Sequence, residues 1–437
     1  MKSSKVAVLA ASAAIALGAC QGGASTAPSA AASAAASTGA SAPASAAGGG
    51  TAIKIGIELP MTGGEAPNGV PTANGVALAL DQIKVDGFTV TINQQDDAVN
   101  GKHDPNQGAQ NMSTLASDPE VLFVVGPYNS NVAQAEIPVS NAAGLMQCSP
   151  ANTAVGLTKG DAAKALRQTN PDKIAYVRVA TTDDNQGAGT ADIAYNVAGA
   201  KTAYVLDDTQ TYGVGLADGF ADAYQKFGGQ ILKRDGVPDS TTDFTSYVTT
   251  AKGMSGLGVV MYGGVTTSGI GLFRKQMAQQ GLANIPLVGG DGIVDGSAAT
   301  ASSYLNIAGP DGDANSYGTV AAIHDIPNPD KFAADYKTKF GSDPGSYSAP
   351  GYACTQIFLQ ALQAVAGTAG GDLAKLREAV RAYVADSSHT YDTVLGKVGF
   401  DANGDTTQHT ISYYQYDSAS KDWKFIKQRD FTAEPVG

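Results

Sequence analysis

Short apolar runs alternate with amphipathic stretches through most of the chain, and this alternation restricts the possible folds more than any other feature. The run IKIGIEL (53–59) has the length and composition of a buried strand. The stretch 72–84 that follows places Val76, Leu80 and Ile83 on one face of a helix. Repeated units of this kind bury their apolar surfaces as a mostly parallel sheet with helices on its faces. The sequence therefore predicts an α/β fold.

The units form two series, and a chain of 437 residues is longer than one hydrophobic core usually supports, since single cores stop growing at about 250–300 residues. The sequence therefore predicts two lobes. In the first series we expect strands at 53–59, 88–96, 121–126 and 145–149, and helices at 72–84, 105–117 and 131–143. In the second we expect strands at 175–180, 202–208, 230–237, 256–264 and 285–292, and helices at 187–199, 216–227, 243–252 and 270–280.

The carboxyl-terminal part adds three helices and a final pair of strands. We expect the helices at 329–340, 352–366 and 373–384. Asn403-Gly404 is a strong signal for a tight turn between two strands. We therefore predict that this turn joins the final strand pair.

The first twenty residues have the composition of a secretion signal: Lys2 and Lys5 precede an apolar run that ends in small residues. That run has fourteen residues, whereas a bilayer span needs about 20. Leu17-Gly18-Ala19-Cys20 resembles the lipobox of bacterial lipoproteins, which implies acylation of Cys20. We therefore expect residues 1–20 to be a lipoprotein signal peptide and Cys20 to be the point of lipidation.

Residues 21–51 are expected to be a tether. Apart from Gln21, residues 21–50 are only Ala, Ser, Gly, Thr and Pro, a composition that cannot bury a core. A flexible segment of this length spans about 30 Å. The predicted location is therefore the periplasm or the cell surface, with the folded part anchored to a membrane by lipid.

Charge and motifs exclude several functions. The formal net charge is −12 at pH 7, and a nucleic-acid partner would require clustered Lys and Arg. The four histidines are scattered, with no HExxH motif and no His/Cys cluster at metal-ligand spacing. Gly213-x-Gly215 departs from the dinucleotide fingerprint, because the next glycine is one position late. We expect no nucleic acid, no cofactor, no metal and no catalytic residue.

Two cysteines remain after Cys20, at positions 148 and 354. In an oxidising compartment Cys148 and Cys354 can form a disulfide. Buried free cysteines also behave as small hydrophobic residues. Their spacing does not decide between these two states.

Four segments, in order, resemble the solute-binding proteins of branched-chain amino-acid ABC transporters, the leucine/isoleucine/valine-binding family. The resemblance runs from about residue 53 to 425. The segments are IKIGIELPMTGGEAPNGVPTANGVALAL, DPEVLFVVGPYNSNVAQAEIPVSNAAGLMQCSPANTAVGLT, DDTQTYGVGLADGF and LVGGDGIVDG.

The resemblance implies a type I periplasmic binding fold, in which two Rossmann-like lobes of mostly parallel sheet close on a ligand and are joined by a three-strand hinge. It also implies ABC permease subunits as membrane partners. The hinge crossings then fall near residues 181–184, 321–324 and 395–398. Lobe 1 would comprise 52–182 plus 323–396, and lobe 2 would comprise 183–322 plus 397–437.

The family's ligand-binding positions can be carried over residue by residue. Ser130 would hold a ligand carboxylate at the start of a helix, where the helix dipole favours negative charge. Asn152 and Thr153 would contact the ligand backbone. Tyr212 and Asp291 would contact its ammonium group from the second lobe.

Three positions depart from the family's type member. They change the side chains that are expected to line the ligand pocket. Asn68 and Val265 stand where the type member has large aromatic residues. Asp291 replaces its glutamate, so the ammonium site keeps a carboxylate but on a shorter side chain. The sequence therefore predicts binding of an amino acid or a related small polar solute, without specifying leucine.

We expect the extracytoplasmic solute-binding component of an ABC importer, which catalyses no reaction. A ligand sensor that engages a membrane receptor is the alternative, because the same lobes and cleft would serve it. A hydrolase or other enzyme on an α/β scaffold is a further alternative, since a fold does not determine a function.

Overall fold

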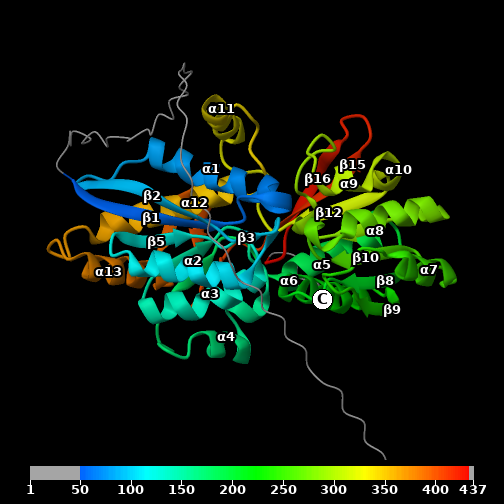
Figure 1. Ribbon diagram of the computed structural model, residues 1–437, viewed down its shortest axis with the longest axis horizontal. Coiled ribbons are helices and arrows are strands. Elements are labelled where there is room, and N and C mark those ends of the chain that lie inside the picture. Colours follow the sequence, from blue (N-terminus) through cyan, green and yellow to red (C-terminus); the bar gives the residue numbers. More distant parts are fainter. Residues whose placement is uncertain (1–49, 433–437) are drawn as a thin grey trace, which may run out of the picture. The chain divides into compact units, whose positions relative to one another are not determined.

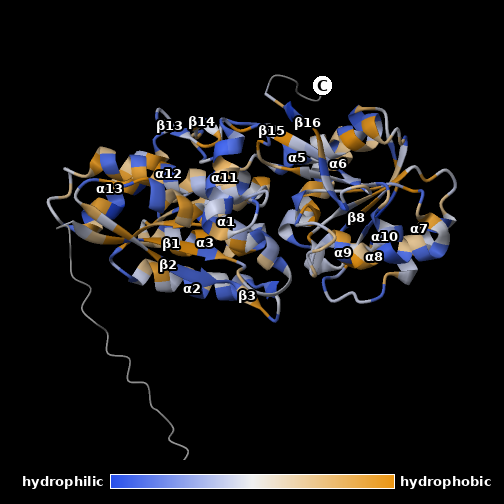
Figure 2. Cartoon of the chain, turned by 90° about the horizontal axis from the view of Figure 1, so that it is seen from above, coloured by the Kyte–Doolittle hydropathy of each residue, from blue (hydrophilic) through white to orange (hydrophobic). Residues whose placement is uncertain are grey.

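The computed structural model describes residues 50–432 (Figure 1). The predicted signal peptide, Cys20 and nearly all of the predicted tether lie outside these residues. The described part is an α/β protein with two separate main sheets, as the alternating sequence pattern predicts. Hydrophobic residues concentrate along the strands of these sheets (Figure 2).

The first sheet is parallel throughout, with the strand order β2-β1-β5-β6-β7. Central strands such as β5 are buried on both faces, which is why this run is apolar at every position. The strands are β1 (Thr51–Leu59), β2 (Phe88–Asp96), β5 (Val121–Val125), β6 (Met146–Ser149) and β7 (Tyr176–Arg178).

Helices cover both faces of the first sheet. Val76 of α1 and Ile357 of α12 pack with Ile55 of β1 in one core cluster, whereas Leu115 of α2 packs with Val124 of β5 in another. The helices here are α1 (Ala66–Gln82), α2 (Pro105–Ser117), α3 (Ser130–Ala143), α4 (Gly160–Leu166), α11 (Pro329–Phe340), α12 (Ser348–Val365) and α13 (Leu373–Ala385).

The second sheet has the order β16-β15-β12-β11-β10-β8-β9, in which the last two strands of the chain add antiparallel to an otherwise parallel sheet. The strands are β8 (Thr202–Asp207), β9 (Gln230–Gly236), β10 (Val259–Gly263), β11 (Leu287–Gly289), β12 (Ser316–Val320), β15 (Thr410–Asp417) and β16 (Asp422–Asp430).

Helices also cover both faces of the second sheet. Phe220 of α6 packs with Val205, and Phe273 of α8 packs with Tyr262, in separate core clusters. The helices are α5 (Asp183–Asp192), α6 (Thr211–Lys226), α7 (Thr245–Gly253), α8 (Ile270–Met277), α9 (Tyr304–Ala308) and α10 (Pro310–Asp313). Two small hairpins complete the architecture: β3 (Ala98–Val99) with β4 (Lys102–His103), and β13 (Thr390–Thr393) with β14 (Gly396–Gly399).

Helix α1 begins six residues earlier than predicted, at Ala66 instead of Thr72. Proline inside a helix removes a backbone hydrogen bond, and Pro71 directly precedes the predicted start. In the structure Pro67 occupies the first turn, where its missing N–H is not needed, and the helix continues through Pro71.

We predicted that the Asn403-Gly404 turn joins the final pair of strands, and this prediction was wrong. The pair does form a turn, with Gly404 at φ +95°, but β15 and β16 are joined by residues 418–421 instead. The Asp401 carboxylate accepts hydrogen bonds from the backbone N–H groups of Asn403 and Asp405, which closes the turn before β15 begins.

The chain joins the second sheet for the last time at Thr410, after this turn. The residues 396–399, near which the third crossing was expected, form β14 and pair with β13. The first and second crossings lie in the connections that follow β7 and β12. The lobe limits derived from the sequence remain a prediction.

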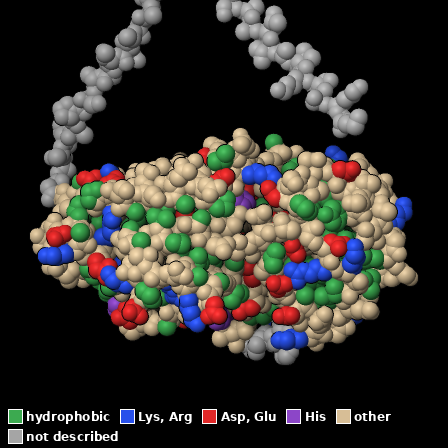
Figure 3. All heavy atoms as spheres, turned by 60° about the horizontal axis from the view of Figure 1, so that its bottom comes forward, with side chains coloured by type: hydrophobic (Ala, Val, Ile, Leu, Met, Phe, Trp, Pro, Cys, Tyr) green, Lys and Arg blue, Asp and Glu red, His purple; other side chains and the backbone are tan. Residues whose placement is uncertain are grey.

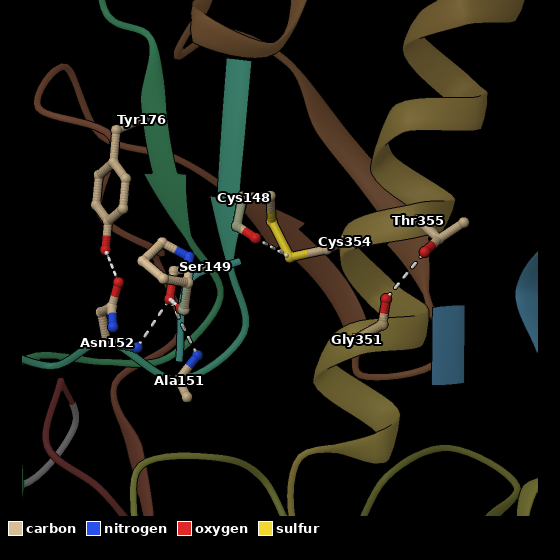
Figure 4. The surroundings of a disulfide bond; sticks show 9 residues. Cys148, Ser149, Ala151, Asn152, Tyr176, Gly351, Cys354 and Thr355 are labelled. Atoms are coloured by element: carbon tan, nitrogen blue, oxygen red, sulfur yellow. Dashed lines mark hydrogen bonds between the residues drawn. A yellow bond between two sulfur atoms is a disulfide. The ribbon is translucent and has the colours of Figure 1, made fainter. Parts of the chain in front are cut away.

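Cys148 and Cys354 form a disulfide, with 5.7 Å between their Cα atoms (Figure 4). The bond links β6, which lies between β5 and β7 in the first sheet, to α12, which covers one face of that sheet. The structure thus decides a pairing that the spacing of the cysteines left open.

Candidate ligand-binding site

A small cavity lies where the loops after the strands of the two sheets meet, as is typical of ligand sites in α/β proteins. Its volume is about 20 Å³. The residues lining it are Tyr128, Asn129, Ser130, Ala151, Thr153, Tyr212, Val265, Asp291 and Gly292. Five of the seven residues predicted to bind ligand are among them: Ser130, Thr153, Tyr212, Val265 and Asp291.

Ser130 is the first residue of α3, and Asn129 is the residue that precedes the helix. The Ser130 hydroxyl oxygen accepts a hydrogen bond from the backbone N–H of Ala154 at 3.3 Å. Its own hydrogen therefore remains available to an acceptor in the cavity. The position at the start of a fourteen-residue helix also favours a negatively charged ligand group.

Asn152 and Thr153 are adjacent but lie differently. Asn152 is turned away from the cavity: its amide donates to the backbone carbonyl of Tyr128 at 2.7 Å and accepts from the Tyr176 hydroxyl at 2.9 Å (Figure 4). Thr153 lines the cavity, and its buried hydroxyl has no hydrogen-bond partner among the described residues. Asn152 therefore positions the loop, whereas Thr153 can reach a ligand.

Asp291 is the carboxylate at the centre of the site and is only 5% exposed. One oxygen accepts hydrogen bonds from the Tyr212 hydroxyl at 2.5 Å and from the Gln186 amide at 2.8 Å. The other oxygen accepts from the Tyr347 hydroxyl. Burial raises the pKa of Asp291, while the hydrogen bonds from Tyr212, Tyr347 and Gln186 oppose that rise.

A second buried carboxylate, Asp183, lies beside the cavity at the start of α5. Burial raises its pKa well above the ordinary value, and the Asp291 charge raises it further. None of the described residues that line the cavity is a lysine or an arginine. The site is thus prepared to accept a cationic group.

Asn68 does not line this cavity. It is in the first turn of α1 and lines a second cavity of about 400 Å³. The lining of this second cavity also includes Val294, Ser346 and Trp423 of β16. Asn68, which was expected to contact the ligand, thus lines the second cavity instead of the small one.

The sequence reasoning missed several residues at the site, and four of them have polar side chains that line the cavity or bind Asp291. Tyr128 and Asn129 directly precede Ser130, so the same GPYNS segment could have indicated them. Gln186 and Tyr347 reach Asp291 from 105 and 56 residues away, and no local pattern marks either one.

Hydrogen bonds connect the loops of the two sheets around the cavity. Glu65, after β1, accepts from Thr267, after β10, at 2.7 Å. Asn131 of α3 donates to Gln210, next to α6, at 3.2 Å. Lys102 of β4 also pairs with an aspartate after β9 at 3.0 Å. The cavity is therefore enclosed by both halves of the molecule.

Two α/β lobes around a polar cavity define a protein that binds a small solute between its halves. The periplasmic binding protein family matches residues 52–421 of the chain. The chain belongs to this family.

Named relatives align in sequence with this chain over most of their length. The chain is 30% identical to the Leu/Ile/Val-binding protein homolog 2 of Brucella abortus over 370 residues, which cover 82% of this chain and 89% of the relative. It is 28% identical to the Leu/Ile/Val-binding protein homolog 1 of Brucella suis over 393 residues, which cover 87% of this chain and 95% of the relative.

Solved structures share the fold, which confirms the predicted type I periplasmic binding architecture. A leucine binding protein LivK from Thermotoga maritima matches with a TM-score of 0.71 and 24% identity, over 86% of this chain and 98% of that one. A Rhodopseudomonas palustris solute binding protein in complex with 4-hydroxybenzoate matches with a TM-score of 0.70 and 19% identity, over 86% and 97% of the two chains.

Two further observations concern the described residues alone. Among residues 50–432, none of the helices is long and apolar enough to span a membrane. The same residues contain no group of three His, Cys, Asp or Glu side chains placed to hold a metal ion.

Proposed function

We propose that this protein is the extracytoplasmic solute-binding component of an ABC importer and that it captures an amino acid between its two lobes. The observation that carries the proposal is the buried Asp291 carboxylate, which faces a cavity without basic lining residues among those described. Relatives named for leucine, isoleucine and valine binding support the same class of ligand.

The geometry suits the two charged ends of an amino acid. We assign the ammonium group to Asp291 and Tyr212, whose side-chain oxygens can accept hydrogen bonds from it. We assign the carboxylate to the Ser130 hydroxyl and the amino-terminal end of α3. Val265 would contact the remainder of the ligand from the second lobe.

An aromatic acid fits this site less well than an amino acid. One structural relative was solved with 4-hydroxybenzoate, which has a carboxylate but no amine. Such an anion would lie beside the buried Asp291 carboxylate with no cationic group of its own, and burial of like charges is costly. An amino group removes this conflict.

Calorimetry on Asp291→Asn tests the proposal. Removing the charged partner of a buried ammonium costs roughly 3–5 kcal/mol, which corresponds to a loss of affinity of two to four orders of magnitude at about 1.4 kcal/mol per tenfold. Asp313→Asn is the matched control, because Asp313 is a buried aspartate of the same half that does not line the cavity.

Each ligand is measured beside its des-amino analogue. If the wild-type protein prefers the des-amino acid, or if Asp291→Asn binds the amino acid as tightly as the wild type, the assignment to an amino acid is wrong. Mass spectrometry of the released ligand also tests whether it is unaltered, as expected for a protein that catalyses no reaction.

The location follows from the amino terminus. The family is periplasmic, and the lipobox resemblance supports an anchor at Cys20. Cys20→Ser should release the protein from membranes and leave ligand binding unchanged, because two or more acyl chains are needed for stable anchoring. Retention of the variant on membranes in high salt would contradict the lipid anchor.

One face of the molecule shows how its charged side chains are distributed. On the face in Figure 3, basic and acidic side chains are interspersed without a continuous basic area. A nucleic-acid partner would require such an area.

A further inference from the structure

Asn129 precedes helix α3 but does not cap it. An asparagine in this position usually accepts a hydrogen bond from a backbone N–H of the first helical turn through its side-chain oxygen. The side chain of Asn129 makes no such bond. Its amide nitrogen donates to the Glu65 carboxylate at 2.8 Å instead. This bond fixes which end of the side-chain amide is the oxygen, because only the NH2 group can donate.

Glu65 connects this amide to the other half of the molecule. Besides Asn129, its carboxylate contacts the His103 ring at 2.6 Å and accepts from the Thr267 hydroxyl at 2.7 Å. Thr267 follows β10 of the second sheet, whereas Asn129 follows β5 of the first. The orientation of the Asn129 amide is thus tied to a contact between the two halves.

The Asn129 side-chain oxygen has no hydrogen-bond partner among the described residues, although Asn129 is only 6% exposed and lines the small cavity. The hydroxyl of the preceding residue, Tyr128, is in the same state. Burial, together with the charges of Asp291 and Glu65, raises the pKa of Tyr128 well above its ordinary value, so the hydroxyl keeps its proton. The cavity wall therefore includes one acceptor and one donor that nothing in the described protein satisfies.

The main-chain groups of an amino acid leave this pair unused. The ammonium group is assigned to Asp291 and Tyr212, and the carboxylate to Ser130 and the start of α3. An apolar ligand side chain would keep Tyr128 and Asn129 buried without partners, which is costly. A second ammonium group could donate to Asn129 but could not accept from Tyr128. A hydroxyl or a carboxamide has both a donor and an acceptor, so it can satisfy both residues.

We propose that Tyr128 and Asn129 determine specificity, and that they select amino acids with a hydroxyl or carboxamide side chain over those with an apolar one. This inference rests on the proposed function, since it presumes an amino acid at Asp291. The cavity in this structure is smaller than any amino acid, so the inference rests on the hydrogen-bonding groups and not on the volume.

Calorimetry with two pairs of amino acids tests the inference on the wild-type protein. Threonine and valine have nearly the same shape, as do asparagine and leucine, so each pair compares polarity at constant size. We expect threonine or asparagine to bind at least about tenfold more tightly than its apolar counterpart, because the apolar side chain leaves buried polar groups unpaired.

The outcomes separate this inference from the proposed function. If valine and leucine bind as tightly as threonine and asparagine, the inference is wrong and the proposed function stands. Binding of none of the four by the folded protein also overturns the inference. The proposed function is then decided by the ligand recovered with the protein, which must have an amino group.

Tyr128→Phe and Asn129→Leu locate the cause. Each removes one of the two unpartnered groups, so the preference for the polar member of a pair should fall by about tenfold through a loss of its affinity. Thr267→Val is the matched control, because it also removes a hydrogen bond to Glu65, whereas Thr267 does not line the cavity. The polar preference should persist in Thr267→Val.

An equal loss of affinity for both members of a pair in these two variants would show that Tyr128 and Asn129 bind the main-chain groups of the ligand or only maintain the fold. That result would overturn the inference. If Asn129→Leu does not fold, Tyr128→Phe tests the same prediction, since it removes a single oxygen atom.

Discussion

The Arg178 guanidinium donates to the Asp405 carboxylate at 2.7 Å, although the two residues are 227 positions apart in the chain. Arg178 is fully buried at the end of β7, and Asp405 is in the turn that precedes β15. Arg178 also donates to the carbonyl of Ala154 at 2.8 Å. The buried Arg178 cation thus connects three parts of the molecule: the first sheet, the loop that contains Thr153 and the turn that precedes β15 of the second sheet.

Asp405→Ala should lower the free energy of unfolding by about 3–5 kcal/mol, because it leaves the Arg178 charge buried without its partner. Urea denaturation at neutral pH measures the loss. The pKa of Asp405 is lowered because the nearby Arg178 charge and hydrogen bonds outweigh the effect of burial. The stabilisation is therefore present above the ordinary pKa of 3.8 and is lost as the pH falls below it.

Lys159→Ala is the matched control for this ion pair. Lys159 contacts the same carboxylate at 2.9 Å, but its side chain is 39% exposed. An exposed pair contributes under about 1 kcal/mol. An equal loss in both variants would show that burial of Arg178 is not the cause.

Ligand affinity should fall as the pH rises past the pKa of His103. Burial lowers this pKa, but the carboxylates of Glu65, Asp208 and Asp239 outweigh it and raise the pKa overall. Asp208 and Asp239 follow β8 and β9 of the second sheet, so we expect their effect to grow when the lobes close. His103 then takes up a proton when the lobes close. The resulting gain in ligand affinity is complete at a pH below the pKa that His103 has in the open form.

Calorimetry between about pH 6 and about pH 9, in buffers with different heats of ionisation, measures both the affinity and the proton uptake. His103→Gln should remove most of the uptake. Proton uptake of the same size in His103→Gln would assign the effect to another group.

Glu136→Gln should stabilise the protein at alkaline pH by on the order of 1 kcal/mol or more. Glu136 and Glu58 are fully buried, and burial raises the pKa of both. A carboxyl with a raised pKa keeps its proton in the folded state and loses it on unfolding, so stability falls as the pH rises above the pKa of the unfolded chain. Glutamine does not ionise and removes this dependence.

Thermal unfolding at pH 5 and pH 8 measures the effect of Glu136→Gln. Glu120→Gln, at the surface beside Lys54, is the matched control. A stabilisation by Glu136→Gln that is larger at pH 5 than at pH 8 would contradict this account.

Reduction of the disulfide should cost about 2–5 kcal/mol of the free energy of unfolding, as is typical for native disulfides. The bond closes a long loop, because Cys148 and Cys354 are 206 positions apart. Urea denaturation with and without a reducing agent measures the cost. The double variant Cys148→Ala/Cys354→Ala should be insensitive to the reducing agent, and an unchanged wild type after full reduction would refute a stabilising role.

Local signals in the sequence were sufficient for several elements. The observed limits of β2, α2 and α11 are those predicted, 88–96, 105–117 and 329–340. For α2 the reason is visible: the Asp104 side chain accepts from the backbone N–H groups of Asn106 and Gln107, and Pro105 occupies the first position. Such caps act within one helical turn, so the sequence contains them completely.

The candidate site was only partly predictable, because its residues come from separate strand ends. Ser130, Thr153 and Asp291 lie shortly after the ends of β5, β6 and β11, and strand order brings such loops together in α/β folds. The orientation of Asn152 was not predictable, since its partners, Tyr176 and the Tyr128 carbonyl, lie on other elements.

The sequence by itself determined the α/β class, two series of strands and helices and the polar residues at the strand ends, because hydrophobic periodicity and caps act over a few residues. Only the tertiary structure decided that Tyr347 and Gln186 reach Asp291, that Asn68 borders another cavity and that Arg178 holds Asp405. These contacts depend on how helices and sheets pack across large sequence separations. Packing of this kind is set by the shape and burial of the whole core, which no local pattern specifies.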